Sequence, residues 1–259
     1  MKAMILASSQ REFIGFHNRR MKKSIIPLIR IASLIEQLRR HDIKDIIIHT
    51  KDMHLEIVRY FGNGERYGVS LSYSLEGVNL GGKESSVNLG SAGGMAKVQR
   101  KTRFFDNDFI VLSDDPYINL DLRNVISFHK ENAAMATIIL KKNVDTQSKQ
   151  NGAIKLDAFR RVSTHRERWC LGESRMNSVD TGIYIFSTRV MDYIPSNQAY
   201  DCRSELIPKL VNANEKVLGY ESDLESLNIG SMQDYLNVSL ALLNRAEYKP
   251  SSIKVRDSG

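Results

Sequence analysis

Cysteine is scarce in this sequence, where Cys170 and Cys202 are the only two among 259 residues. Two cysteines cannot build the disulfide framework of a small secreted domain, so we expect a protein of a reducing compartment, the cytoplasm. Long apolar runs are missing as well. None approaches the roughly 20 residues that cross a bilayer, and the apolar part of MKAMILASSQREF is too short for a signal peptide. We therefore expect no membrane partner.

Low-complexity segments and internal repeats are also absent. The composition, with 42% hydrophobic and 26% charged residues, is that of a globular protein with one large core. A net charge of +7 suits nucleic acid, an anionic membrane or a phosphorylated small molecule, and it is equally typical of a plain soluble surface. Basic and aromatic residues are not interleaved and no nucleic-acid motif occurs, so the sequence disfavours nucleic acid as a partner.

Strands and helices alternate over the first 141 residues, which predicts a mostly parallel sheet covered by helices on both faces. Apolar runs predict strands over residues 2–7, 45–49, 70–73, 108–113 and 135–141. Helical periodicity and turn residues predict helices over 25–40, 54–61, 92–99 and 122–132. This succession is typical of a Rossmann-like half domain.

The pattern changes after residue 142. We expect strands over 153–156, 182–186 and 217–220 and helices over 205–211 and 232–245, with a long polar connection between the first two strands. We interpret residues 1–245 as one domain, made of a first half over 1–141 and a second half over 142–245, followed by a loose tail over 246–259. The glycine-rich segment 77–88 predicts an enlarged loop.

Seven segments, taken in order, resemble one enzyme family. They are MKAMILA, YFGNGERYGVSLSYSLE, LGSAGGMAKVQ, FIVLSDDPYINLDL, SVDTGIYIF, MDYIP and LNIGSMQDYLNVS. The chain is similar over about residues 1–245 to the sugar-phosphate nucleotidyltransferases of the mannose-1-phosphate guanylyltransferase and glucose-1-phosphate thymidylyltransferase group. The resemblance implies an α/β protein with a Rossmann-like mixed, mostly parallel sheet, the nucleotide-diphospho-sugar transferase fold. It also implies that 1–141 binds the nucleotide and that 142–245 forms a smaller β-rich sugar-binding lobe.

The phosphate-binding loop departs from the family pattern, which is roughly GxGTRL followed by PKP. Glycines there let backbone N–H groups close on a triphosphate. Residues 8–15 read SSQREFIG, so both loop glycines are missing, Glu12 adds a negative charge and Phe13 replaces the arginine. A solvated basic loop is therefore an open alternative. The residues that the resemblance still assigns here are Ala7, Ser8 and Ser9 as nucleotide contacts and Lys23, at the PKP lysine, as a catalytic cation.

The metal site of the family also departs from its pattern. The family holds Mg²⁺ with one Asp that ends a strand and a second Asp in a DIG motif. Asp115 matches the first ligand and would also contact the nucleotide, whereas Asn228 replaces the second. Mg²⁺ prefers oxygen ligands, and Asn keeps an oxygen but loses a charge. Either Asp115 and Asn228 hold Mg²⁺, or the strand end is an acidic remnant without a metal.

The sugar side is closer to the family. Gly152 matches a glycine of the sugar pocket, and Glu167 with Arg168 replaces a Glu-Lys pair, in which Arg168 would be the catalytic cation. Asp180 and Thr181 stand where the family has an Asn-Thr or Asn-Ala sugar contact. For each glycine, plain turn chemistry is the alternative. A turn beside base and sugar is implied by Gly90, Ser91 and Gly93 in LGSAG.

Two functions follow from this resemblance. An enzyme would join a nucleoside triphosphate and a sugar 1-phosphate to form an NDP-sugar and pyrophosphate. We expect weak or lost catalysis, because each phosphate contact contributes on the order of 10²–10³ in rate and several are altered. The alternative is a divergent, active enzyme of nucleotide-sugar and polysaccharide biosynthesis. The expected partners are a nucleotide, a sugar 1-phosphate or an NDP-sugar, together with a second copy of the chain or an active paralogue.

Overall fold

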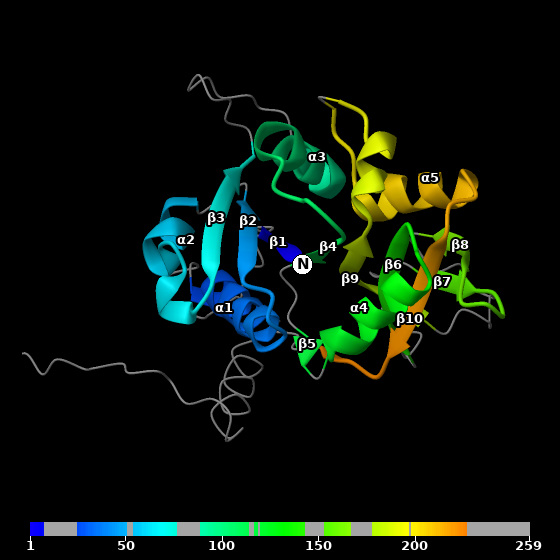
Figure 1. Cartoon of the computed structure of the whole chain (residues 1–259), viewed down its shortest axis with the longest axis horizontal. Coiled ribbons are helices and arrows are strands. Elements are labelled where there is room, and N and C mark those ends of the chain that lie inside the picture. The colour runs from blue at the N-terminus through cyan, green and yellow to red at the C-terminus, as the bar shows by residue number, and fades with distance from the viewer. Residues whose placement is uncertain are drawn as a thin grey trace, which may run out of the picture.

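The computed structural model describes residues 1–7, 25–50, 54–76, 89–113, 117–118, 120–142, 153–166, 178–196 and 198–226. One mixed sheet runs through its middle (Figure 1). The strands of this sheet are β1 (Lys2–Ala7), β2 (Asp45–Thr50), β3 (Ser70–Leu75), β4 (Phe109–Ser113), β6 (Ala136–Lys142), β7 (Ala153–Leu156), β8 (Val162–Arg166), β9 (Ser178–Phe186) and β10 (Val217–Ser222). A separate two-stranded sheet pairs β5 (Tyr117–Ile118) with β11 (Glu225–Ser226).

The strand order is β10-β6-β9-β4-β1-β2-β3. Strand β1 runs parallel to both β2 and β4, β2 runs parallel to β3, and β10 runs parallel to β6. Strand β9 is antiparallel to its neighbours β4 and β6. The prediction of a mixed, mostly parallel sheet is confirmed, and the antiparallel strand lies inside the sheet rather than at its edge.

Helices cover both faces of the sheet (Figure 1). One face packs against α1 (Ile25–Arg40), α2 (His54–Phe61) and α4 (Leu122–Glu131), and the other against α3 (Gly90–Thr102) and α5 (Ile207–Asn212). The described residues also form two 3-10 helices, η1 (Glu65–Tyr67) and η2 (Thr188–Tyr193), and a π-helix, η3 (Cys202–Leu206). Within the described stretches, no helix combines the length and the apolar character that a membrane span needs.

Helix α1 shows how the sequence pattern becomes packing. Its bounds are those that the periodicity predicts, and Ile31, Leu34 and Leu38 are fully buried against the sheet. Each side chain of this size contributes about 1.5–3 kcal/mol when it leaves water. The stripe of large apolar residues therefore fixes which side of α1 faces the core.

Strand β9 joins the second half of the chain to the first. All nine of its residues are buried, although the sequence predicts a strand over 182–186 only. The difference arises because Ser178, Asp180 and Thr181 are polar, and each is hydrogen-bonded in the interior. Strands β7 and β8 extend from β9, and β10 pairs with β6. The strands expected in a smaller lobe are thus continuous with the central sheet.

Strand β8 corrects one interpretation, because residues 162–166 were expected in a polar connection. The turn that connects β7 to β8, over residues 157–161, contains no glycine. The Asp157 side chain accepts hydrogen bonds from the N–H groups of Phe159 and Arg161, and Arg160 adopts a positive φ of 60°. Such an Asx-type turn has a weak sequence signal, and Val162 is a lone buried apolar residue. The loop at 77–88, the helix at 232–245 and the tail at 246–259 lie outside the described residues.

Candidate functional site

The carboxyl ends of the parallel strands lie along one edge of the sheet, and open α/β sheets bind ligands at this edge. Strand β1 ends at Ala7, which is buried and pairs with Thr50 of β2, and β4 ends at Ser113. Because β9 is antiparallel, its first residues reach the same edge: Leu112 pairs with Ile183, so Asp180 and Thr181 lie just beyond the end of β4. We treat this edge as the candidate site.

A turn at the start of helix α3 forms one side of the site. Gly90 has a φ of 67°, and a Cβ there would lie 2.8 Å from the carbonyl oxygen of Tyr200, so only glycine fits. The N–H of Gly93 donates to the same carbonyl at 2.9 Å, and the N–H of Tyr200 donates to Leu89 O at 2.8 Å. The turn is therefore held directly against the chain at residue 200.

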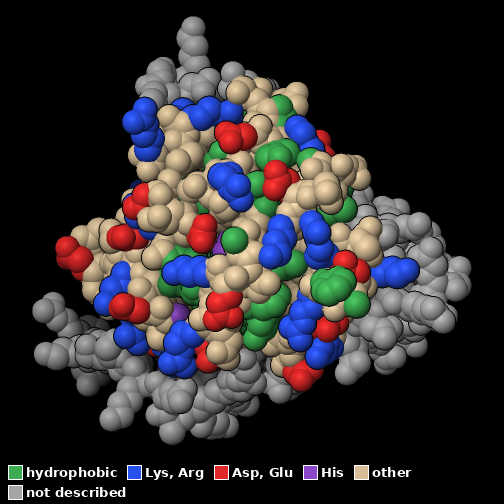
Figure 2. Space-filling view, turned by 45° about the vertical axis from the view of Figure 1, so that its right-hand side comes forward, with side chains coloured by type: hydrophobic (Ala, Val, Ile, Leu, Met, Phe, Trp, Pro, Cys, Tyr) green, Lys and Arg blue, Asp and Glu red, His purple; other side chains and the backbone are tan. Residues whose placement is uncertain are grey.

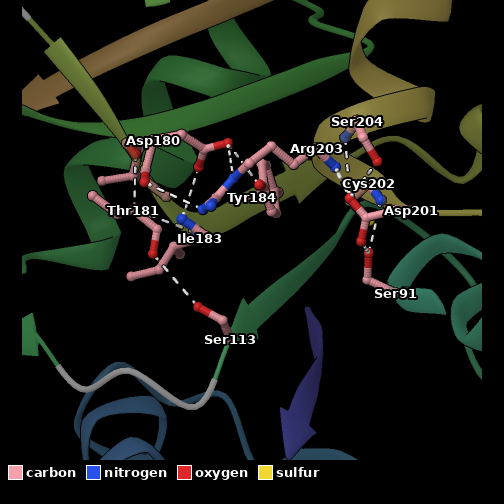
Figure 3. Close-up of polar contacts among 12 residues, drawn as sticks. Ser91, Ser113, Asp180, Thr181, Ile183, Tyr184, Asp201, Cys202, Arg203 and Ser204 are labelled. Atoms are coloured by element: carbon pink, nitrogen blue, oxygen red, sulfur yellow. Dashed lines mark hydrogen bonds and ion pairs between the residues drawn. The ribbon is translucent and has the colours of Figure 1, made fainter. Parts of the chain in front are cut away.

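Asp201, the next residue after Tyr200, also contacts the turn at the start of α3. Ser91 donates its hydroxyl to Asp201 Oδ2 at 2.6 Å, and Ser91 Oγ accepts the N–H of Cys202 at 2.7 Å. Asp201 Oδ1 accepts the N–H groups of Arg203 at 2.8 Å and Ser204 at 3.0 Å, as an N-cap does. These donors lower the pKa of Asp201 although its burial opposes the shift. Asp201 is thus a charged junction between α3 and η3 (Figure 3).

Helix η3 is a π-helix, in which the N–H of Leu206 donates to Asp201 O at 2.9 Å. The sequence predicts an α-helix that starts at residue 205, and the structure corrects this: η3 spans 202–206 and the α-helical turns of α5 follow it. The widened turn directs the side chain of Arg203 toward β9 (Figure 3). Single π turns of this kind are frequent at functional sites.

An ion pair between a buried carboxylate and a partly exposed guanidinium links η3 to strand β9. Arg203 donates from Nε to Asp180 Oδ2 at 3.1 Å and from Nη2 to Asp180 O at 3.3 Å. Asp180 Oδ2 also accepts the hydroxyl of Tyr184 at 2.8 Å, and Oδ1 accepts the N–H of Gly182 at 2.7 Å. Burial lowers the pKa of Arg203, but the charge of Asp180 and the hydrogen bonds to Asp180 and Tyr184 together outweigh it, and the pKa is raised. The guanidinium that faces the Asp180 carboxylate is therefore charged at neutral pH.

The residues after Asp180 complete this side of the site. Thr181 donates its hydroxyl to Ile139 O at 2.7 Å, which anchors β9 to β6. Gly182 has a φ of 76°, and a Cβ there would lie 2.3 Å from Ser113 Oγ. The absence of a side chain at Gly182 thus allows the end of β4 to approach β9. Figure 3 shows this approach at Ser113, whose hydroxyl donates to Thr181 O at 3.5 Å.

The Nucleotidyl transferase family profile matches residues 16–245. The chain belongs to the nucleotidyl transferase family. A relative, the UTP--glucose-1-phosphate uridylyltransferase of Synechocystis sp., is 36% identical over 95% of this chain and 64% of its own length. The mannose-1-phosphate guanylyltransferase of Mycobacterium tuberculosis is 23% identical over 85% of this chain and 58% of its own length. The chain thus spans about three fifths of the length of these relatives.

The fold of this member of the nucleotidyl transferase family also matches solved structures. A UDP-glucose pyrophosphorylase complexed with UDP-glucose superposes with a TM-score of 0.69 over 93% of this chain and 98% of the other, at 14% identity. At that identity the match concerns the fold alone. It agrees with the fold that the sequence segments predict.

The structure brings together part of the site expected for a nucleotidyl transferase. The predicted residues that it describes are Ala7, Gly90, Ser91, Gly93, Asp180 and Thr181. Those at the start of α3 and those on β9 are joined through Asp201 and Arg203. The predicted residues outside the described stretches are Ser8, Ser9, Lys23, Asp115, Gly152, Glu167, Arg168 and Asn228. Among the described residues, no group of three or more His, Cys, Asp or Glu side chains is placed to hold a metal ion.

The sequence analysis missed three residues of this site: Tyr184, Asp201 and Arg203. Asp201 had a detectable signal, because an Asp followed by Glu205 at the start of a helix resembles a capping box, and Glu205 Oε2 indeed accepts the N–H of Asp201 at 2.7 Å. Arg203 had none, since its partner Asp180 is 23 residues away along the chain. Figure 2 shows basic and acidic side chains interspersed over one face rather than a continuous basic stripe.

Proposed function

We propose that this chain is a sugar-1-phosphate nucleotidyltransferase that forms an NDP-sugar. A phosphate oxygen of the sugar 1-phosphate attacks the α-phosphorus of the triphosphate, the bond between the α-phosphorus and the bridging oxygen breaks, and pyrophosphate leaves. The observation that carries the proposal is a series of contacts at one sheet edge. Ser91, in the turn assigned to the nucleotide, bonds to Asp201, Asp201 accepts the N–H of Arg203, and Arg203 bonds to Asp180 on β9, the strand assigned to the sugar. A family match over residues 16–245 supports it.

UTP and glucose 1-phosphate are the first substrates to test. The relative with 36% identity over 95% of this chain is named a UTP--glucose-1-phosphate uridylyltransferase. The altered loop at residues 8–15 argues for a lower rate than its relatives reach, not for a different reaction. Ser8, Ser9 and Lys23 would contact the phosphates, and Gly152, Glu167 and Arg168 would contact the sugar phosphate, all as predictions from the sequence.

Mg²⁺ would be held by Asp115 and Asn228 in this proposal. Strands β5 and β11 pair in antiparallel register, with Ser226 opposite Tyr117 and Glu225 opposite Ile118. The described strand that follows Asp115 in the sequence thus pairs with the described strand that precedes Asn228. One carboxylate and one amide oxygen, completed by substrate phosphates, fit the ligand preference of Mg²⁺. When bound, the ion would neutralise charge on the leaving pyrophosphate.

A non-catalytic sugar-nucleotide-binding subunit is the second candidate. The observation in its favour is the loop itself, in which Glu12 places a negative charge where a triphosphate would bind and no glycine precedes Gly15. Such a subunit would bind the product-like NDP-sugar at least as well as the free triphosphate. Assembly with a second copy or an active paralogue remains a prediction.

The deciding experiment measures pyrophosphate release from UTP and glucose 1-phosphate with Mg²⁺, followed by the other triphosphates and common sugar 1-phosphates. Calorimetric titration with UTP and UDP-glucose runs beside it. We expect release that falls by about 10²-fold in Asp115→Asn, because a phosphate-side charge is lost. Binding of UDP-glucose without release would favour the non-catalytic subunit. Neither binding nor release from any pair would refute the proposed function.

A further inference from the structure

Asp180 stands where the family resemblance implies a sugar contact, yet its carboxylate is enclosed by protein. The side chain has an exposed fraction of 0%. Its oxygens accept hydrogen bonds from the Tyr184 hydroxyl, the Gly182 N–H and the Arg203 guanidinium. A carboxylate surrounded in this way has no free edge for a sugar hydroxyl.

Arg203 covers this carboxylate, and part of its own side chain reaches solvent. Its side chain is 30% exposed. Nη2 lies 3.6 Å from the point where a Cβ of Gly182 would stand, and that point is also 2.3 Å from Ser113 Oγ. The guanidinium therefore lies beside Ser113 at the end of β4, the residue that precedes Asp114 and Asp115 in the sequence. A guanidinium offers five N–H donors and no acceptor, so its ligand partner must be an acceptor oxygen.

Two independent anchors fix the position of this guanidinium. From β9, Asp180 binds Nε through its carboxylate and Nη2 through its carbonyl. From the nucleotide side, Asp201 accepts the N–H of Arg203 at 2.8 Å while it accepts the Ser91 hydroxyl at 2.6 Å. Few rotamers remain for the side chain, and such preorganisation strengthens a ligand contact because little freedom is lost on binding.

We propose that Arg203 is a specificity-determining residue for the sugar 1-phosphate. Its guanidinium donates to an oxygen of the sugar-phosphate moiety, and Asp180 is a positioning residue that holds the guanidinium without touching the ligand. This inference rests on the proposed function and deepens it, because it assigns the acceptor-binding role at this edge to Arg203 rather than to residue 180.

The competing explanation is an ion pair that only fastens η3 to β9. Both explanations predict lower stability when the pair is broken, so stability cannot separate them. They differ in which substrate is affected. Loss of a ligand contact changes the KM for the sugar 1-phosphate and the affinity for UDP-glucose. Loss of a purely structural contact changes these constants and the KM and Kd for UTP together.

The test uses Arg203→Met, Arg203→Lys and Asp180→Asn, with Lys209→Met as a matched control that removes an exposed cation from the neighbouring helix α5. Steady-state kinetics give KM for glucose 1-phosphate and for UTP, and calorimetry gives the Kd for UDP-glucose and for UTP. We expect Arg203→Met to raise the KM for glucose 1-phosphate and the Kd for UDP-glucose by about tenfold or more, as loss of one charged hydrogen bond does. The KM and Kd for UTP should change by less than about twofold, within the scatter of an unaffected site.

The other variants sharpen the outcome. Arg203→Lys keeps the positive charge but loses the planar guanidinium. This variant should fold and should still raise the KM for glucose 1-phosphate and the Kd for UDP-glucose, the sugar-side constants. Asp180→Asn should move the same constants in the same direction but less, because the guanidinium remains and only its anchor is weakened. If Arg203→Met does not fold, Arg203→Lys decides the question. Unchanged sugar-side constants in that variant, or equal changes on both sides, would overturn the inference. A wild-type protein without release and without UDP-glucose binding would instead refute the proposed function itself.

Discussion

His49, near the end of β2, should make the protein sensitive to acid. Its side chain is 5% exposed and its Nδ1 lies 3.1 Å from Ser74 Oγ. Nε2 is buried without a hydrogen-bond partner in the described part of the chain. Burial, together with the positive charge of Lys97, lowers the pKa of His49 from the ordinary 6.5 to about 4. The folded protein therefore holds this ring neutral at pH 7.

The sign of the effect follows from where each state takes up the proton. The unfolded chain protonates this histidine near pH 6.5, whereas the folded chain does so only near pH 4. The unfolded state binds more protons between these values, so the free energy of unfolding falls as the pH falls from 6.5 toward 4. At about 1.4 kcal/mol for each pH unit, His49 removes about 2 kcal/mol by pH 5 and about 3 kcal/mol in all.

Urea unfolding at pH 7.5, 6.5, 5.5 and 5.0 measures this directly, with His49→Asn as the non-titrating variant. Asn keeps an amide near Ser74 but leaves space, so the variant is less stable at pH 7.5. The difference in unfolding free energy between wild type and variant should shrink by about 2 kcal/mol by pH 5. Ser74→Ala, which keeps the imidazole, should retain the wild-type slope. Parallel curves for wild type and His49→Asn would refute the reasoning.

Three further predictions concern the site. Gly182→Ala should lower the unfolding free energy in urea by about 1–3 kcal/mol, because the new Cβ meets Ser113 at a positive φ; Ser113→Gly should restore part of it, and no loss would contradict the close approach. Ser91→Ala should cost about 1–3 kcal/mol, because the buried Asp201 loses a donor, and should also weaken UTP binding by calorimetry. EDTA should stop pyrophosphate release and Mg²⁺ should restore it, whereas release in EDTA would argue against a metal at Asp115.

Most of the fold could be predicted from the sequence, for identifiable reasons. The helices over 25–40 and 54–61 have the predicted bounds because their apolar stripes are strong and their ends carry turn signals. Strand β9 was only half predicted, since its first residues are polar and become compatible with a sheet interior only through distant partners. Its place between β4 and β6 depends on pairing across the chain, which periodicity does not encode.

The site was less predictable than the fold. A resemblance assigns roles position by position, so it drew attention to Gly90, Ser91 and Asp180 and passed over Arg203. The role of Arg203 depends on a carboxylate 23 residues away and on the π turn that directs it. Neither feature has a local sequence signal. The contact at Asp201, by contrast, begins with a short-range cap of the kind that sequence reasoning can detect.

The pair of Asp180 and Arg203 also bears on the altered phosphate loop. Where the family resemblance implies a neutral Asn, a buried carboxylate alone would be strongly destabilising, since an uncompensated buried charge costs several kcal/mol. The chain instead places a guanidinium on it at 3.1 Å, together with a hydroxyl and a backbone N–H. One departure from the family pattern is therefore matched by a second residue that no motif contains. The same compensation applies to residues 8–15. Positive charge lost there can be supplied by a residue elsewhere in the fold, so the missing glycines and arginine do not by themselves imply lost catalysis. We therefore expect this chain to release pyrophosphate from UTP and glucose 1-phosphate despite its altered loop.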